Sequence, residues 1–219
     1  MRQRLRLLLY FAIFWVSFQI VIRAAFLLYN HDFSQQLTFG EISKIFLHGL
    51  KMDISMSGYF LMLTGLILTL SVFTQSRWVC FALNTVTILV LLLSSIIVII
   101  DLELYRHWGF RLNTAPFFYV AGAESEAIGS VEIPVVIKLL LVLAALFTLS
   151  LYLYHMWLNP KLRALAPTER KNAFVLLIVS ALMFIPIRGS FTVAPMNTGF
   201  VYFHKTKSYA NHAAINVIW

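Results

Sequence analysis

Charged residues are scarce in this sequence of 219 residues. They make up 12% of the chain, whereas hydrophobic residues make up 60%. Soluble globular proteins carry about 25% charged residues. So few charges leave too little polar surface to cover a water-soluble body, and the excess apolar residues must face lipid. The composition therefore excludes a soluble enzyme and a disordered chain.

Cysteine and the motifs of soluble catalysis are also lacking. The single cysteine, Cys80, excludes an intramolecular disulfide and hence a disulfide scaffold. The chain has no nucleophile elbow and no glycine loop of the kind that holds phosphates or dinucleotides. His204 and His212 have no partner at a spacing that encodes a metal site. We expect no catalytic residue, no metal ligand and no cofactor within this chain.

What the sequence does contain is a series of long apolar runs. A helix that crosses a membrane needs about 20 mostly apolar residues. Arg23 and Lys138 lie near the ends of their runs, where a long side chain can reach the membrane surface, so the middle of each run is free of ionisable groups. That pattern argues against a channel or pump. We predict an all-α membrane protein whose five spans are residues 7–29, 54–73, 78–100, 133–157 and 171–187.

The distribution of basic residues predicts the orientation of these spans. Short loops on the cytoplasmic side of a membrane are enriched in lysine and arginine. One side of the predicted bundle would carry eight basic residues and one acid, Glu169; the eight are Arg2, Arg4, Arg6, Arg77, Lys161, Arg163, Arg170 and Lys171. The N-terminus is therefore predicted inside, and five crossings place the C-terminus outside.

Short interfacial helices are predicted on the outer face. Thr38 and Glu41 have the spacing of a capping box, and apolar residues follow with a helical period from Ile42 to Leu50. This segment is either a surface helix or the first turns of the second span. Residues 117–122 resemble a second interfacial piece. Residues 188–219 form a tail, which we expect to pack along the outer face through aromatic side chains.

Charged groups gather at the predicted outer edge of the bilayer. Guanidinium groups bind phosphate through paired hydrogen bonds. We hypothesise that three arginines receive a lipid phosphate and that three carboxylates hold them in place; the arginines are Arg106, Arg111 and Arg188, and the carboxylates are Asp53, Asp101 and Glu103. The alternative is that Arg106 only pairs with a neighbouring acid.

Several short motifs resemble a known family. They are Lys51-Met52-Asp53-Ile54, the Asp101–Arg111 loop, Arg188-Gly189 and the Asn211–Asn216 tail. Together they resemble the membrane domain of lipoteichoic-acid-synthase-like phosphoglycerol transferases, in the alkaline-phosphatase and sulfatase superfamily. Ser190 stands where the family often has a second glycine.

The resemblance implies that a large extracytoplasmic domain follows the five helices. In the family that domain carries a threonine nucleophile and a divalent metal, manganese or magnesium, and transfers glycerol phosphate from phosphatidylglycerol. This chain would anchor that domain in a bacterial cytoplasmic membrane and present the lipid headgroup to it. The alternatives are a self-sufficient membrane scaffold or partner subunit without enzymatic activity, and a transporter fragment.

Overall fold

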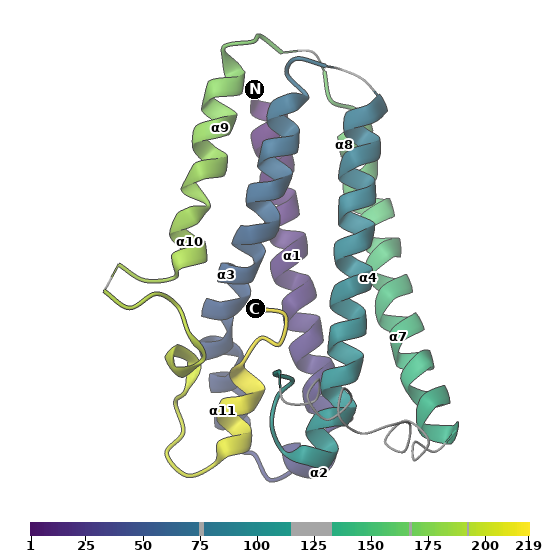
Figure 1. Ribbon diagram of the computed structural model, residues 1–219, viewed down its shortest axis with the longest axis vertical. Coiled ribbons are helices and arrows are strands. Elements are labelled where there is room, and N and C mark those ends of the chain that lie inside the picture. Colours follow the sequence, from purple (N-terminus) through teal and green to yellow (C-terminus); the bar gives the residue numbers. More distant parts are fainter. Residues whose placement is uncertain (75–76, 115–132, 167, 192) are drawn as a thin grey trace.

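The computed structural model describes residues 1–74, 77–114, 133–166, 168–191 and 193–219. These residues form helices joined by turns and loops, with no strand among them, which confirms the all-α prediction. Four long helices run along the longest axis of the molecule (Figure 1). They are α1 (Arg2–Tyr29), α3 (Phe39–Leu70), α4 (Arg77–Trp108) and α7 (Ile133–Leu153), the last continuing through a π-helical turn η1 (Tyr154–Leu158) into α8 (Asn159–Arg163).

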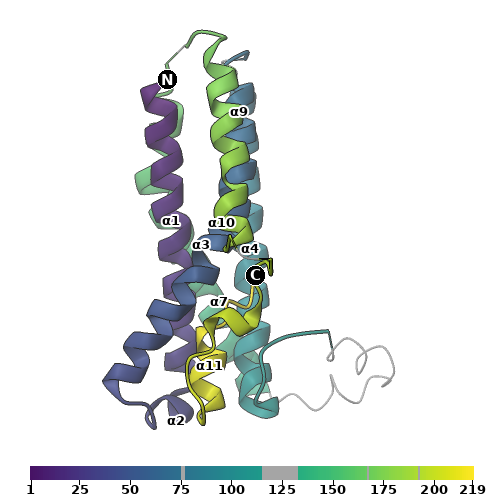
Figure 2. The same cartoon turned by 90° about the vertical axis from the view of Figure 1, so that its left-hand side faces the viewer.

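The bundle has two distinct ends. The N-terminus, α8 and the start of α9 (Asn172–Leu182) lie at one end, which we call the N-terminal end (Figures 1 and 2). The opposite end, called the tail end, carries α2 (His31–Ser34) and α11 (Ser208–Ala214). Between them, α10 (Phe184–Arg188) continues α9, and η2 (Thr198–Val201) precedes α11.

Among the described residues, four helical segments are long and apolar enough to cross a membrane: Arg2–Tyr29, Phe39–Leu70, Arg77–Trp108 and Ile133–Arg163. The fifth predicted span corresponds to the shorter apolar segment Asn172–Arg188. Many large apolar side chains on these segments point away from the bundle, as in Leu9 and Leu141, which are 58% and 66% exposed. These features are compatible with a membrane protein, and a fifth crossing stays a prediction.

Two helices extend further toward the tail end than the predicted spans. Thr38 caps α3 as expected: its hydroxyl accepts from the Glu41 amide, and the Glu41 carboxylate accepts from the Thr38 amide at 2.7 Å. The helix then continues without interruption to Leu70, so the residues proposed as a surface helix are the first turns of α3. The predicted interfacial segment 117–122 lies outside the described residues.

Helix α4 continues past its predicted end at Ile100 to Trp108. The helix continues through the charged residues after Ile100, and the first of them, Asp101, pairs with Arg111. Gly109 ends it with φ of 71°, a left-handed conformation that glycine adopts at little cost. A helix of 32 residues spans about 48 Å at 1.5 Å per residue, well over the ~30 Å hydrocarbon core.

Helices α3 and α9 approach each other closely through small residues. A Cβ atom added at Gly65 would collide with the Ser180 hydroxyl of α9. One added at Gly58 would lie 3.0 Å from Cγ1 of Ile187, which belongs to α10. Small residues allow helix backbones to approach within a membrane, where packing rather than hydrophobicity drives association. Pro186 lacks an amide hydrogen, which explains why the helix is interrupted at Met183 between α9 and α10.

The fourth long helix changes its environment at the π-helical turn. Before this turn, α7 buries only Leu146 and Ser150. Tyr154 and Leu158 within the turn, and Leu162 after it, are completely buried. The turn directly precedes Pro160, whose ring would clash with a carbonyl one turn earlier in a regular helix.

Candidate functional site

The tail (residues 193–219) folds back onto the bundle at the tail end and is held there by polar contacts. Asn211 organises the loop before α11: its side-chain oxygen accepts from the amides of Phe203 and His204, each at 2.8 Å. Farther along, the indole of Trp219 donates to the Ser55 hydroxyl of α3 at 2.9 Å. The tail is therefore part of the bundle, although it contains no long apolar run.

A buried ion pair joins α1 to α3 under the tail. One guanidinium nitrogen of Arg23 donates to the Asp53 carboxylate at 2.6 Å, and both side chains are almost completely buried. The backbone of α3 comes so close at Gly49 that any side chain there would meet the guanidinium group. The amide nitrogen of Asn216 donates to the same carboxylate oxygen at 2.9 Å and to Gln19 at 3.1 Å.

A second buried ion pair joins the end of α4 to the loop that follows it. Arg111 binds Asp101 through two nitrogens, at 3.1 and 3.0 Å, and the Leu112 amide donates to the same carboxylate at 2.8 Å. The guanidinium carbon of Arg111 lies 4.0 Å from the ring centre of Phe26, a cation–π contact with α1. Burial lowers the pKa of the Arg111 guanidinium, and the charge of Asp101 opposes that change.

Both arginines also donate to the backbone of the tail. Arg23 donates to the Ala213 carbonyl at 2.7 Å and Arg111 to the His212 carbonyl at 3.3 Å. These carbonyls belong to the last turn of α11, where carbonyl groups carry a partial negative charge; that of His212 also accepts from the Ile215 amide at 3.0 Å. Two bundle cations therefore recognise the C-terminal turn of one short tail helix.

The Arg23–Asp53 ion pair and its neighbour Gln19 do not satisfy all of their polar atoms. Nε2 of Gln19, Nε of Arg23 and Oδ2 of Asp53 are buried and have no hydrogen-bond partner among the described residues. Buried polar atoms without partners cost free energy. The network is therefore better suited to fixing one arrangement of α1, α3 and the tail than to adding stability by itself.

Aromatic side chains surround the second ion pair. The ring of Tyr105 lies 4.9 Å from that of Phe26 and 5.6 Å from that of Tyr209, between centres. The Tyr209 hydroxyl lies 2.6 Å from the Ser34 hydroxyl of α2, and burial raises the pKa of Tyr209. This cluster excludes water from the ion pair and adds apolar contact between the tail and the bundle.

His212 is the titratable group of this contact nearest to neutral pH. Its Nδ1 lies 3.0 Å from the Tyr105 hydroxyl. Burial, and then the charge of Arg111, lower the pKa of its imidazole below the ordinary 6.5, while a hydrogen bond with the Gly109 backbone opposes this change. The folded state therefore favours the neutral ring.

We predict that acid loosens the tail. A group whose pKa is lower in the folded state binds protons more readily when released, so its contribution is complete above pH 6.5 and is lost as the pH falls through the lowered value. The protection factors of residues 208–216 in hydrogen exchange, corrected for the intrinsic pH dependence of exchange, should fall below pH 6.5. In His212→Gln the pH dependence should be weaker, whereas His31→Gln, an exposed control, should behave like the unmodified chain. Equal pH profiles in all three proteins would contradict the prediction.

A third group of contacts fixes the tail at the start of α3. The Glu41 carboxylate pairs with Lys207 at 2.8 Å and with His204 at 3.0 Å. Lys207 also donates to the Gln36 carbonyl at 3.0 Å. The same glutamate that completes the capping box thus also binds the tail.

The structure places the predicted arginines in different surroundings. Arg111 is buried against Asp101, as the hypothesis of supporting carboxylates requires. Arg106 is 47% exposed and lies 3.9 Å from Asp32. Arg188 is half-buried, and its Nε donates to the Ser190 carbonyl at 3.1 Å. No bond among the described residues unites the three in one site, and their proposed role toward a lipid phosphate stays a prediction.

The other two predicted carboxylates bind different partners. Asp53 holds Arg23, not one of the three predicted arginines. Glu103 accepts a hydrogen bond from the Tyr29 hydroxyl and lies 2.9 Å from Nε2 of His107. In the part of the chain that the structure describes, no three His, Cys, Asp or Glu residues are placed to hold a metal ion.

Sequence reasoning missed the participation of Arg23, Gln19 and Asn216. The interpretation that Arg23 reaches the membrane surface is wrong, because its side chain points into the bundle toward Asp53. The available signal was an ionisable residue within an apolar run, which in membrane proteins usually faces the protein interior. For Gln19 and Asn216, which are 197 residues apart, no local pattern gave a signal.

No protein-family model, curated protein or solved structure matches this chain.

Proposed function

We propose that this chain is the membrane domain of an extracytoplasmic phosphoglycerol transferase or related sulfatase-like hydrolase. In this proposal five helices cross the bacterial cytoplasmic membrane, with the N-terminus inside and the tail outside. The apolar helices support a membrane location. The basic residues support the orientation, because those that begin α1, α4 and α9 lie at the N-terminal end (Figure 1).

One observation carries the proposal: two buried arginines of the bundle bind consecutive carbonyls of the tail, those of Ala213 and His212. A domain joined through a flexible linker would move freely relative to its anchor. A tail fixed by buried ion pairs instead gives a following domain a defined position above the membrane. Tethering raises the effective concentration of the lipid substrate, and a fixed orientation lowers the entropy cost of bringing it to the reacting groups.

The proposed ligand is the phosphate of a phosphatidylglycerol-like lipid at the tail end. Arg106 has an exposed guanidinium group near the end of α4, whereas Arg188 ends α10, which lies between the two ends of the bundle (Figure 1). Arg111 would support the site by holding the tail, because its own charge is paired with Asp101. A divalent metal would belong to the catalytic domain and not to this chain.

We predict that the double variant Arg106→Gln and Arg188→Gln lowers headgroup transfer by the full-length protein. Each lost charge-assisted hydrogen bond weakens phosphate binding by about tenfold. The measurement is kcat/KM for release of glycerol phosphate from phosphatidylglycerol in proteoliposomes at equal protein content. Arg170→Gln, which removes an exposed arginine at the N-terminal end, is the matched control and should leave the rate unchanged.

Two results would decide against the proposal. Unchanged transfer in the double variant would remove these arginines from the lipid site. No transfer or hydrolysis of any lipid headgroup by the unmodified protein would remove the enzymatic role and favour a membrane scaffold.

A further inference from the structure

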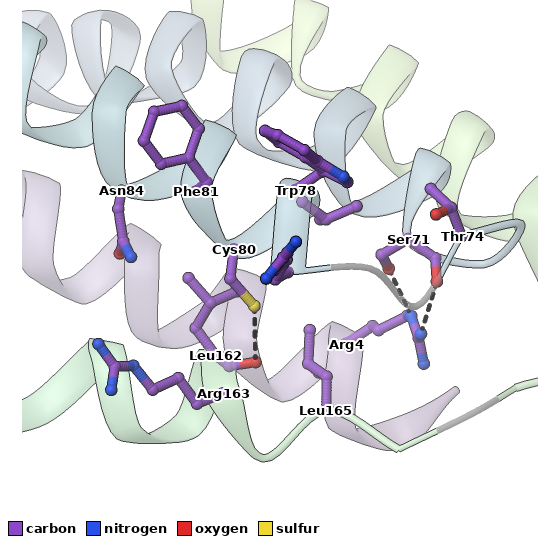
Figure 3. A pocket seen from close by; sticks show the side chains of 12 residues that line it. Arg4, Ser71, Thr74, Trp78, Cys80, Phe81, Asn84, Leu162, Arg163 and Leu165 are labelled. Atoms are coloured by element: carbon purple, nitrogen blue, oxygen red, sulfur yellow. Dashed lines mark hydrogen bonds between the residues drawn. The ribbon is translucent and has the colours of Figure 1, made fainter.

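A cavity of about 580 Å³ lies at the N-terminal end, away from the tail. It is enclosed by the first residues of α1 and α4, the end of α3 and the segment around α8 (Figure 3). Its volume is in the range of sites that bind small molecules. The residues that line it are Arg4, Ser71, Thr74, Arg77, Trp78, Val79, Cys80, Phe81, Asn84, Leu162, Arg163 and Leu165.

Arg4 is the buried cation of this cavity. Its side chain is 2% exposed, yet no carboxylate pairs with it among the described residues. Its nitrogens donate to the hydroxyl and carbonyl of Ser71, at 2.9 and 3.1 Å (Figure 3). Another guanidinium nitrogen donates to the Ala166 carbonyl at 3.0 Å. These bonds use three of the five N–H groups of a guanidinium. Arg4 therefore brings to the cavity a positive charge that no described carboxylate neutralises.

Two further arginines add positive charge to the same cavity. Arg77 begins α4, and Arg163 ends α8, where its Nε donates to the Asn159 side chain at 2.9 Å. Neither pairs with a carboxylate in the part of the chain that the structure describes, and none of the described lining residues is acidic. Arg4 and Arg77 also lie in the first turns of their helices, where the helix dipole is positive and a cation is unfavourable. Arg77 and Arg163 are exposed, so the cost of an unpaired buried charge falls on Arg4, and an anion in the cavity would reduce it.

The cavity also has an apolar wall. Trp78 and Phe81 line it from α4 and are 66% and 62% exposed, so the wall continues onto the apolar outer surface of the helix. A free phosphate would need only the arginines. A phospholipid would use both parts, its phosphate against the arginines and its acyl chains along α4.

We propose that this cavity binds the phosphodiester of an anionic phospholipid from the leaflet at the N-terminal end of the bundle. The site is separate from the proposed lipid site at the tail end and shares no residue with it. Basic pockets between membrane helices are a recurrent way of holding anionic headgroups. The proposal depends on a membrane location but not on any enzymatic activity.

Cys80 provides a built-in probe, because it lines the cavity and is the single cysteine of the sequence. We predict that Cys80 of the purified full-length protein reacts more slowly with N-ethylmaleimide in nanodiscs of phosphatidylglycerol and phosphatidylcholine than in nanodiscs of phosphatidylcholine alone. The double variant Arg77→Gln and Arg163→Gln, which leaves the buried Arg4 in place, should need about tenfold more phosphatidylglycerol for the same protection.

The controls separate this site from the others. Arg170→Gln, at the same end but outside the cavity, and the double variant Arg106→Gln and Arg188→Gln at the tail end should both keep full protection. Inorganic phosphate and glycerol phosphate, added to phosphatidylcholine nanodiscs, test the free anion. Equal protection by these soluble anions would overturn the lipid assignment. Equal reaction rates in both kinds of nanodisc, or protection unaffected by the cavity variant, would overturn the site.

Discussion

Replacing Asp53 with alanine is expected to lower the free energy of unfolding of the bundle by about 3–5 kcal/mol. The change leaves the Arg23 guanidinium buried with the Ala213 carbonyl as its remaining acceptor. It also removes an acceptor of Asn216, so the tail should loosen together with the bundle. Thermal unfolding in detergent measures the first effect, and hydrogen exchange of residues 208–216 measures the second.

Two further variants test the cause of that loss. Removing both charges, with Arg23→Met and Asp53→Leu, should cost less than Asp53→Ala alone, because no unpaired charge then remains buried. Asp32→Ala, which removes a carboxylate that is 77% exposed and 3.9 Å from Arg106, should have little effect. If the double variant were as unstable as Asp53→Ala, the unpaired charge of Arg23 would not be the cause of the lost stability.

The second large effect is expected at the contact between α3 and α9. Gly65→Leu should lower the free energy of unfolding by about 1–3 kcal/mol, because even the first side-chain atom would collide with Ser180. The damage should be local, with faster hydrogen exchange in residues 172–182 than in α1. Both quantities can be measured on one detergent preparation.

Gly40→Ala is the matched control for this substitution. It lies on the same helix, and an added Cβ there meets nothing within 4 Å. Alanine at that position should be neutral or stabilise α3 by up to about 1 kcal/mol. If Gly65→Leu and Gly40→Ala unfolded at the same temperature, the close approach of α3 and α9 would not contribute to the stability of the bundle.

Local patterns predicted the helices better than they predicted the contacts between them. Apolar runs located four long helices, and the Thr38–Glu41 spacing identified the start of α3. The acid Asp101 was expected to support an arginine, and it binds Arg111 ten residues later. These features involve residues close to one another in the sequence, so the hydrophobic period and the residue spacing are enough to predict them.

The candidate site required information that no local pattern contains. Arg23 and Asp53 each lie in a separate helix, and only the rotation of those helices about their axes brings them together. The tail has no apolar run, and its attachment depends on carbonyl and amide groups such as those of Ala213 and Asn216. Backbone carbonyls occur at every residue, so the sequence does not single out the two that the arginines bind.

Buried arginines at the two ends of the bundle differ in whether a carboxylate pairs with them. At the tail end, Arg23 and Arg111 are buried with aspartates and also bind the chain itself. At the N-terminal end, Arg4 is equally buried without a carboxylate among the described residues. At the tail end the positive charges are paired within the protein, and these pairs fix the position of the tail on the bundle. The N-terminal end leaves charge for a ligand, which is why we place the further lipid site there.

The π-helical turn at Tyr154–Leu158 affects which side of the fourth long helix faces the bundle. One additional residue in a turn shifts the angular phase of everything after it by about 100°. The buried side chains of this helix recur every four residues, at Leu146, Ser150, Tyr154, Leu158 and Leu162. A regular helix has about 3.6 residues per turn and would carry such a series gradually around its surface, so the additional residue helps to keep the series on the side that faces the bundle. Other positions remain apolar and exposed, as at Leu141 and Leu149.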